Sequence, residues 1–343
     1  MKKPMQKIIY SLLLAILVII ISTVVGSANI PFSQIPAIFS HKLFSNPLPA
    51  EIDSLLVDIF WKIRLPRALA SFLVGGALAV SGTVMQSVLR NPLASSYTLG
   101  VSAGASLGVA LYMAFGISLP IIGNFILPFI GFSFGLATVF IAIGLSSRFN
   151  PGLENQTIIL TGMVISLFMN SLLTIIMSVF REHLQRVVFW QLGSFSGLKW
   201  IELGILTLSI LPIVVILMRY TLELDIITFG EEHAISVGID LKKTKLILIT
   251  LATFLTGASV SFVGVIGFVD LIAPHIVRRI FGSSHRLVLP LSFVFGGTFM
   301  AFADIISRLI ISPKELPIGS VTALIGAPFF IWVYFSKKRG VNA

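Results

Sequence analysis

Long apolar runs separated by short polar segments make up most of this chain. A helix that crosses a bilayer needs about 20 mostly apolar residues, and most of the runs reach about that length. The pattern predicts an all-α protein with about ten transmembrane helices. Their expected bounds are residues 8–28, 67–89, 97–117, 121–145, 156–180, 201–218, 246–268, 270–281, 287–310 and 317–335.

Two parts of this pattern indicate broken or short helices. Residues 91–147 carry no charge, and this run is too long for one helix. Pro120, Gly123 and Asn124 predict where it divides, because Pro and Gly disfavour a helix interior. The element at residues 270–281 is short, contains a proline and ends in a basic cluster.

The polar segments predict which side of the membrane each loop occupies. Residues 29–63 contain four prolines and read as an extracytoplasmic loop, whereas residues 219–245 form a long cytoplasmic loop. With the N-terminus inside, the inner segments carry a net charge of +9 and the outer ones +1. Because Lys and Arg accumulate on cytoplasmic loops, we expect both termini of a multi-pass protein of the cytoplasmic membrane to lie in the cytoplasm.

Composition narrows the class of protein. Of the 343 residues, 56% are hydrophobic and 11% charged, whereas a soluble domain has about a quarter charged residues. This excludes a soluble enzyme and predicts one transmembrane domain over residues 1–343. The net charge of +10 is explained by the loop bias, and without a basic–aromatic patch we expect no nucleic-acid partner.

The sequence motifs favour a protein that catalyses no reaction itself. Gly100–Gly104 matches the GxSxG pattern, with Ser102 as the nucleophile of a possible intramembrane hydrolase, but it lies in an apolar run without the required strand–turn–helix context. No GxxxxGK[ST] or HExxH motif is present, so we expect no nucleotide site, no metal site and no catalytic residue. Few carboxylates fall inside the runs, which disfavours an ATP-independent secondary carrier.

Two charged groups go against the expected distribution. Arg64, Arg67 and Arg308 lie at predicted outer helix ends, where they either snorkel to the lipid headgroups or form a docking surface for an acidic partner. On the inner side, residues 230–239 read as a short helix with Ala234, Ile235 and Val237 as an apolar surface. That helix is either a connecting loop or a knob that fits a groove in a cytoplasmic partner.

Several stretches together resemble the FecCD family of ABC-importer permeases, which handle ferric siderophores, haem and cobalamin. They are IRLPRALASFLVGGALAVSGTVMQSVLRNPLASSYTLGVSAGASLG at 63–108, GEEHAISVGID at 230–240, GVIGFVDLIAPHIVRRIFGSSHR at 264–286 and ADIISRLIISPKELPIGSVTALIGAPFFIWV at 303–333. The pieces occur in the family's order over nearly the whole chain.

The resemblance implies a type II importer permease similar to the cobalamin importer permease. It implies a dimer of permeases, either homo- or heterodimeric, with two cytoplasmic ATPases and an extracytoplasmic binding protein. ATP is then used by the partners, and no cofactor is bound by this chain. A ferric siderophore is the expected cargo, with cobalamin or haem as alternatives.

The resemblance also assigns roles to residues. It places Arg64, Arg67 and Arg308 in binding-protein docking. The residues it assigns to ATPase coupling are Gly230, Glu231, Glu232, Ala234 and Gly238. Those that it places at the pathway or its inner gate are Asn91, Leu93, Ser166 and Asn170.

Overall fold

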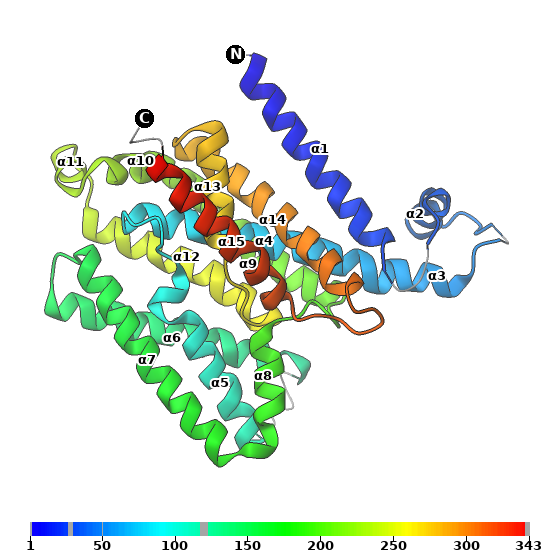
Figure 1. Ribbon diagram of the computed structural model, residues 1–343, viewed down its shortest axis with the longest axis horizontal. Coiled ribbons are helices and arrows are strands. Elements are labelled where there is room, and N and C mark those ends of the chain that lie inside the picture. Colours follow the sequence, from blue (N-terminus) through cyan, green and yellow to red (C-terminus); the bar gives the residue numbers. More distant parts are fainter. Residues whose placement is uncertain (1, 27–29, 50, 117–122, 340–343) are drawn as a thin grey trace.

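The computed structural model describes residues 2–26, 30–49, 51–116 and 123–339, which contain helices and no strand. Ten helices correspond to the ten predicted crossings (Figure 1). They are α1 (Lys2–Val24), α4 (Leu65–Val88), α5 (Val101–Phe115), α6 (Ile126–Phe149), α7 (Asn155–Val179), α9 (Trp200–Leu217), α12 (Leu241–Val263), α13 (Val269–Phe281), α14 (His285–Leu309) and α15 (Ile318–Arg339).

Among the described residues, seven helical stretches are long and apolar enough to cross a membrane, and α5 and α15 contain shorter apolar segments. At 13 residues, α13 is shorter than a spanning helix, as its proline and charges predicted. The prediction of about ten membrane helices is therefore confirmed. The predicted break at Pro120 lies outside the described residues, as does the end of the first run at residues 27–28.

Helices in the connecting segments modify the prediction. The segment predicted to lie outside contains α2 (Ile35–Phe44) and α3 (Ser54–Asp58), and α3 continues through a π-helical turn into α4. A further helix, α8 (Leu184–Leu192), follows α7. The prediction of a loop from residue 219 was wrong in its first half, because α10 (Thr221–Phe229) continues α9 by burying Leu224 and Ile227. The short helix α11 (Glu231–Ser236) follows it.

The centre of the molecule is α4, of whose most apolar stretch 89% is buried. It packs closely on α14, where a Cβ at Gly75 would overlap the backbone carbonyl of Gly296. Likewise, a Cβ at Gly104 of α5 would overlap Thr138 of α6. At these positions glycine lets the two helix backbones approach closely.

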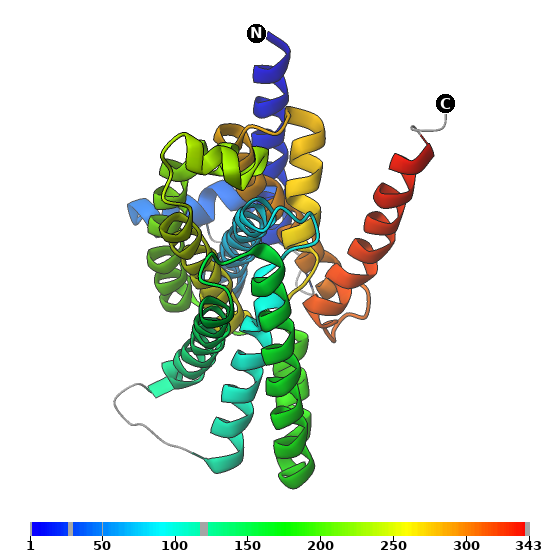
Figure 2. The same ribbon diagram turned by 90° about the vertical axis from the view of Figure 1, so that its left-hand side faces the viewer.

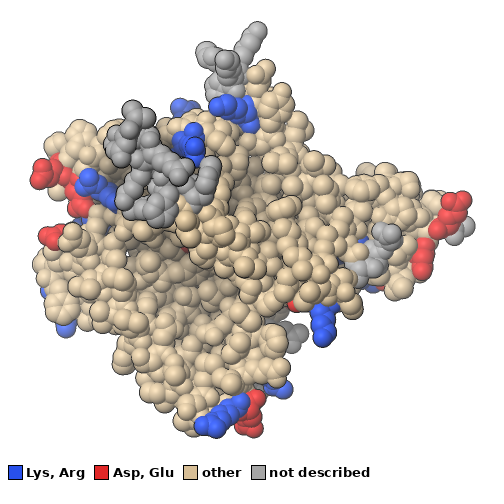
Figure 3. Space-filling model, viewed as in Figure 1, with Lys and Arg blue, Asp and Glu red and all other residues tan. Residues whose placement is uncertain are grey.

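The periphery is less tightly packed. Helix α7 is only 17% buried over its apolar stretch, and α15 stands away from the main bundle (Figure 2). The visible charged side chains gather at the edges of the molecule and leave a broad uncharged surface between them (Figure 3). This distribution is that of a protein whose middle faces lipid or other apolar helices.

Candidate functional sites at the two ends of α14

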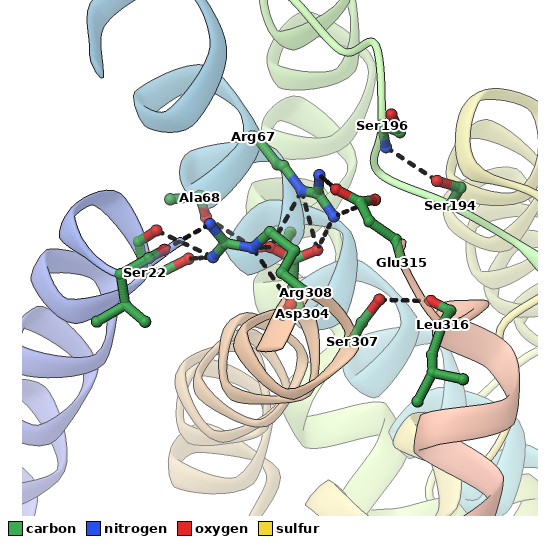
Figure 4. A network of polar contacts seen from close by, with 12 residues as sticks. Ser22, Arg67, Ala68, Ser194, Ser196, Asp304, Ser307, Arg308, Glu315 and Leu316 are labelled. Atoms are coloured by element: carbon green, nitrogen blue, oxygen red, sulfur yellow. Dashed lines mark hydrogen bonds and ion pairs between the residues drawn. The ribbon is translucent and has the colours of Figure 1, made fainter. Parts of the chain in front are cut away.

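One polar cluster lies at the C-terminal end of α14. Arg67 of α4 donates from Nη2 to Asp304 Oδ1 at 2.8 Å and from Nη1 to Glu315 Oε1 at 2.7 Å. Arg308, one turn after Asp304, forms an ion pair with that carboxylate (Nε to Oδ2, 3.1 Å) and donates from Nε to the Asp304 backbone carbonyl at 3.3 Å. Figure 4 shows the Arg67 guanidinium held between the two carboxylates. Each Arg67–carboxylate pair involves two guanidinium nitrogens, the geometry in which arginine binds carboxylates most strongly.

Arg308 also connects this cluster to α1. Its Nη2 donates to the carbonyl and hydroxyl of Ser22, both at 2.9 Å, and its Nη1 donates to the Val25 carbonyl at 2.9 Å. Arg64 donates to the Val24 carbonyl at 2.5 Å. The guanidinium groups thus take up carbonyls at the end of α1, which a helix terminus leaves without intrahelical partners.

The structure therefore brings together the three arginines that the sequence singled out. They line a cavity of about 250 Å³ with Gly26, Pro313 and Glu315. Their exposed fractions are only 5% for Arg64, 6% for Arg67 and 9% for Arg308. Snorkelling was the wrong interpretation, because these groups bond to protein atoms. Docking of a partner remains a prediction.

Sequence reasoning missed the two acids of this cluster. Asp304 is fully buried, and the Glu315 side chain is 35% exposed. The i, i+4 spacing of Asp304 and Arg308 was the available signal. Three arginines and two carboxylates leave one net positive charge around the cavity.

The second site is at the N-terminal end of α14, about 37 Å away along a 25-residue helix. His285 Nδ1 lies 2.6 Å from Asp225 Oδ1 of α10, and His285 Nε2 lies 2.6 Å from Ser87 Oγ of α4. These contacts tie α10 to the two central helices. Because α11 follows α10 directly, the contacts also fix the place where the predicted coupling segment begins.

The predicted coupling residues belong to the short helix α11 and to the two glycines that flank it. Gly230 has φ +149° and Gly238 has φ +89°, values that favour glycine. Ala234 is fully buried, so it was wrong to place it on the apolar surface of α11. The exposed apolar side chains there are Ile235 at 60% and Val237 at 53%.

Of the two predicted coupling acids, one is engaged within the chain. Glu231 Oε1 accepts a hydrogen bond from Lys245 Nζ at 2.9 Å, whereas Glu232 is exposed on the first turn of α11. The two adjacent carboxylates therefore have different environments. Of these two acids, only Glu232 is fully exposed.

The predicted gate residues lie next to the second site. Asn91 lines a cavity of about 440 Å³ together with Arg90, Phe229, Arg278 and His285. The Asn91 side chain accepts from the Leu93 backbone N–H at 2.9 Å, which is an Asx turn. Leu93 itself is exposed.

The two predicted pathway residues on α7 face differently. Ser166 packs at the start of α5, where its Oγ lies 2.9 Å from the position a Cβ on Gly100 would take. Asn170 is on the exposed side of α7 with Leu167 and Phe168. A role in the pathway remains a prediction for both.

The remaining candidates are the Ser102 hydrolase motif and a metal site. Ser102 is in the first turn of α5, after a 3-10 turn at Ser96–Leu99 and not after a strand. Within the described part of the chain, no group of three or more His, Asp or Glu residues is placed to hold a metal ion.

Comparison with known proteins identifies the family. The model of the FecCD transport family matches residues 13–336. The uncharacterized ABC transporter permease YvrB of Bacillus subtilis is 37% identical over 94% of this chain and 91% of its own. The cobalamin import permease BtuC of Halobacterium salinarum is 34% identical over 88% of this chain and 79% of its own.

A solved structure agrees with these relatives. A chain of an ABC transporter assigned to the metal-chelate type, in an inward-facing conformation, superposes with a TM-score of 0.81 and 29% identity, covering 96% of this chain and 99% of that one. The protein is thus a multi-pass membrane permease of the ABC importer class. It belongs to the FecCD transport family.

Proposed function

We propose that the chain imports a ferric siderophore, which an extracytoplasmic binding protein delivers and two separate ATPases drive across the membrane. The observation that carries this proposal is the pair of sites at opposite ends of α14. The arginine cluster, with its net positive charge, suits an acidic partner outside. Helix α11, with exposed Ile235 and Val237, suits a groove in an ATPase inside.

Docking at buried arginines requires an exchange of partners. Arg67 holds Asp304 inside the protein and Glu315 at the rim of the cavity. A carboxylate of the binding protein would replace Glu315 and keep Arg67 neutralised throughout. This matters because a buried charge without a partner is costly.

We propose the orientation that the loop charges predicted, with both termini in the cytoplasm. Lys7 of α1 donates to the Ile280 carbonyl at 3.4 Å, which places the start of α1 beside the end of α13. The start of α1 and the last residues of α15 lie at the same end of the molecule as α10 and α11 (Figures 1 and 2). We assign this end to the cytoplasm because the segments that reach it were predicted to be inner from their excess of Lys and Arg, which accumulate on cytoplasmic loops. ATP is used by the partner ATPases, and no cofactor is held by this chain.

The cargo is tested by uptake in cells with and without this gene. Labelled ferric siderophores of different chemical classes are compared with labelled cobalamin and haem. Loss of uptake for one siderophore class is the expected result. Loss of cobalamin uptake alone would support the second candidate, which the 34% identical cobalamin permease favours.

A further inference from the structure

A fully buried lysine joins three segments near the cytoplasmic end of the molecule. Lys245 of α12 has an exposed fraction of 0%. Its Nζ donates to the Leu153 carbonyl at 3.0 Å, to Asn155 Oδ1 at 2.9 Å and to Glu231 Oε1 at 2.9 Å. A lysine ammonium has three N–H donors, so each donor has one of these acceptors.

The acceptors come from different elements. Leu153, with φ +52°, lies in the turn between α6 and α7, and Asn155 is the first residue of α7. Glu231 is the first residue of α11. Lys245 therefore connects the proposed ATPase-contacting helix directly to the start of α7.

Burial of the Lys245 ammonium makes the loss of any of its three acceptors costly. A buried ammonium is tolerated only when it is paired and its remaining donors are bonded. If α11 moved away from α7, Lys245 would lose either its carboxylate or its two α7-side acceptors. We therefore expect α11 and the start of α7 to move together.

Helix α7 is well suited to follow such a movement. Within this chain it is the least buried of the long spans, at 17%, so few contacts of the chain itself hold it in place. Its Leu160, Leu167 and Phe168 are exposed, so displacing α7 does not require opening the central α4–α14 packing.

We propose that Lys245 is the positioning residue that transmits displacement of α11 to the cytoplasmic end of α7. This inference rests on the proposed function, because it assumes that an ATPase moves α11. Lys245 does not touch cargo or nucleotide in this account. It acts through Glu231 and Asn155.

The experiment uses the complete importer, reconstituted with its ATPases and binding protein. Lys245→Met removes all three hydrogen bonds, and Lys242→Met is the matched control, since Lys242 is exposed one residue after the start of the same helix. Cargo imported per ATP hydrolysed is expected to fall roughly tenfold in Lys245→Met, a size typical of coupling between sites. Lys242→Met should match the wild type.

A distance measurement separates coupling from a merely structural effect. The chain has 0 cysteines, so spin labels at Ser236→Cys and Gln156→Cys attach only to α11 and α7 of each permease chain, both positions being exposed. With Lys245 present, this distance should stay constant when ATP is added. With Lys245→Met, it should broaden or change with ATP.

The two measurements together test the role of Lys245. A constant label distance and an unchanged ratio of cargo to ATP in Lys245→Met would overturn the inference. If that variant does not assemble, Asn155→Ala, which removes a single acceptor, takes its place with the same criteria. If the wild-type complex imports none of the chelates under ATP, the proposed function fails, whereas the label distances still judge the connection itself.

Discussion

Glu315 occupies the position that a docking carboxylate would need. It binds Arg67 through both carboxylate oxygens, at 2.7 and 3.0 Å, from the segment between α14 and α15. Asp304 binds the same guanidinium but is fully buried. Of these two acids, the partly exposed Glu315 is therefore the one that a partner can replace.

Glu315→Gln should tighten binding of the binding protein by several-fold. The neutral amide competes less well for Arg67 than a carboxylate does, since charged hydrogen bonds are about twice as strong. Arg67 keeps Asp304, so the fold is retained. Binding-protein affinity for the reconstituted permease is the measurement, and Glu51→Gln, an exposed outer acid, is the control. Equal or weaker affinity in Glu315→Gln would contradict the exchange.

At the scale of elements, the sequence predicted more of the helices than of their contacts. An apolar run of about 20 residues specifies a membrane helix by its own composition, so the spans were predictable. The carboxylate partners of Arg67 lie 237 and 248 residues along the chain, and two of the three partners of Lys245 lie 90 and 92 residues away. Their pairing depends on packing that no local pattern encodes. Ala234 was misplaced for the same reason, because burial of one helix face depends on what lies beneath it.

The α4–α14 contact yields a stability prediction. In Gly296→Ala the new Cβ would overlap the Gly75 carbonyl and Ala79, so the free energy of unfolding should fall by about 1–3 kcal/mol. In the control Gly204→Ala, the new Cβ meets nothing within 4 Å, so stability should stay unchanged or rise slightly. Denaturation in detergent compares the two. Equal stabilities would refute the close approach of these helices.

The exposed face of α11 yields a prediction about assembly. Ile235→Asp places a charge on a side chain that is 60% exposed, so the permease should still fold while co-purification of the ATPase falls by about tenfold or more, as for loss of an apolar anchor. The control is Leu43→Asp at the outer side, which is 61% exposed. Undiminished ATPase binding by Ile235→Asp would remove α11 from the interface.

At the scale of the whole molecule, the two sites lie at opposite ends of one helix, and in the proposed function each end meets a different partner. α14 holds Arg308 near its C-terminal end and His285 at its N-terminal end, and it packs on the central α4 along its length. The described part of the chain offers neither a metal cluster nor a strand-based hydrolase site.

The most direct test of this account is chelate uptake into proteoliposomes that contain the permease with its ATPases and binding protein. We predict that uptake requires ATP and the binding protein, and that it continues when an ionophore abolishes the proton gradient. Uptake by the permease alone, driven by the gradient and indifferent to ATP, would contradict the account and establish a secondary carrier.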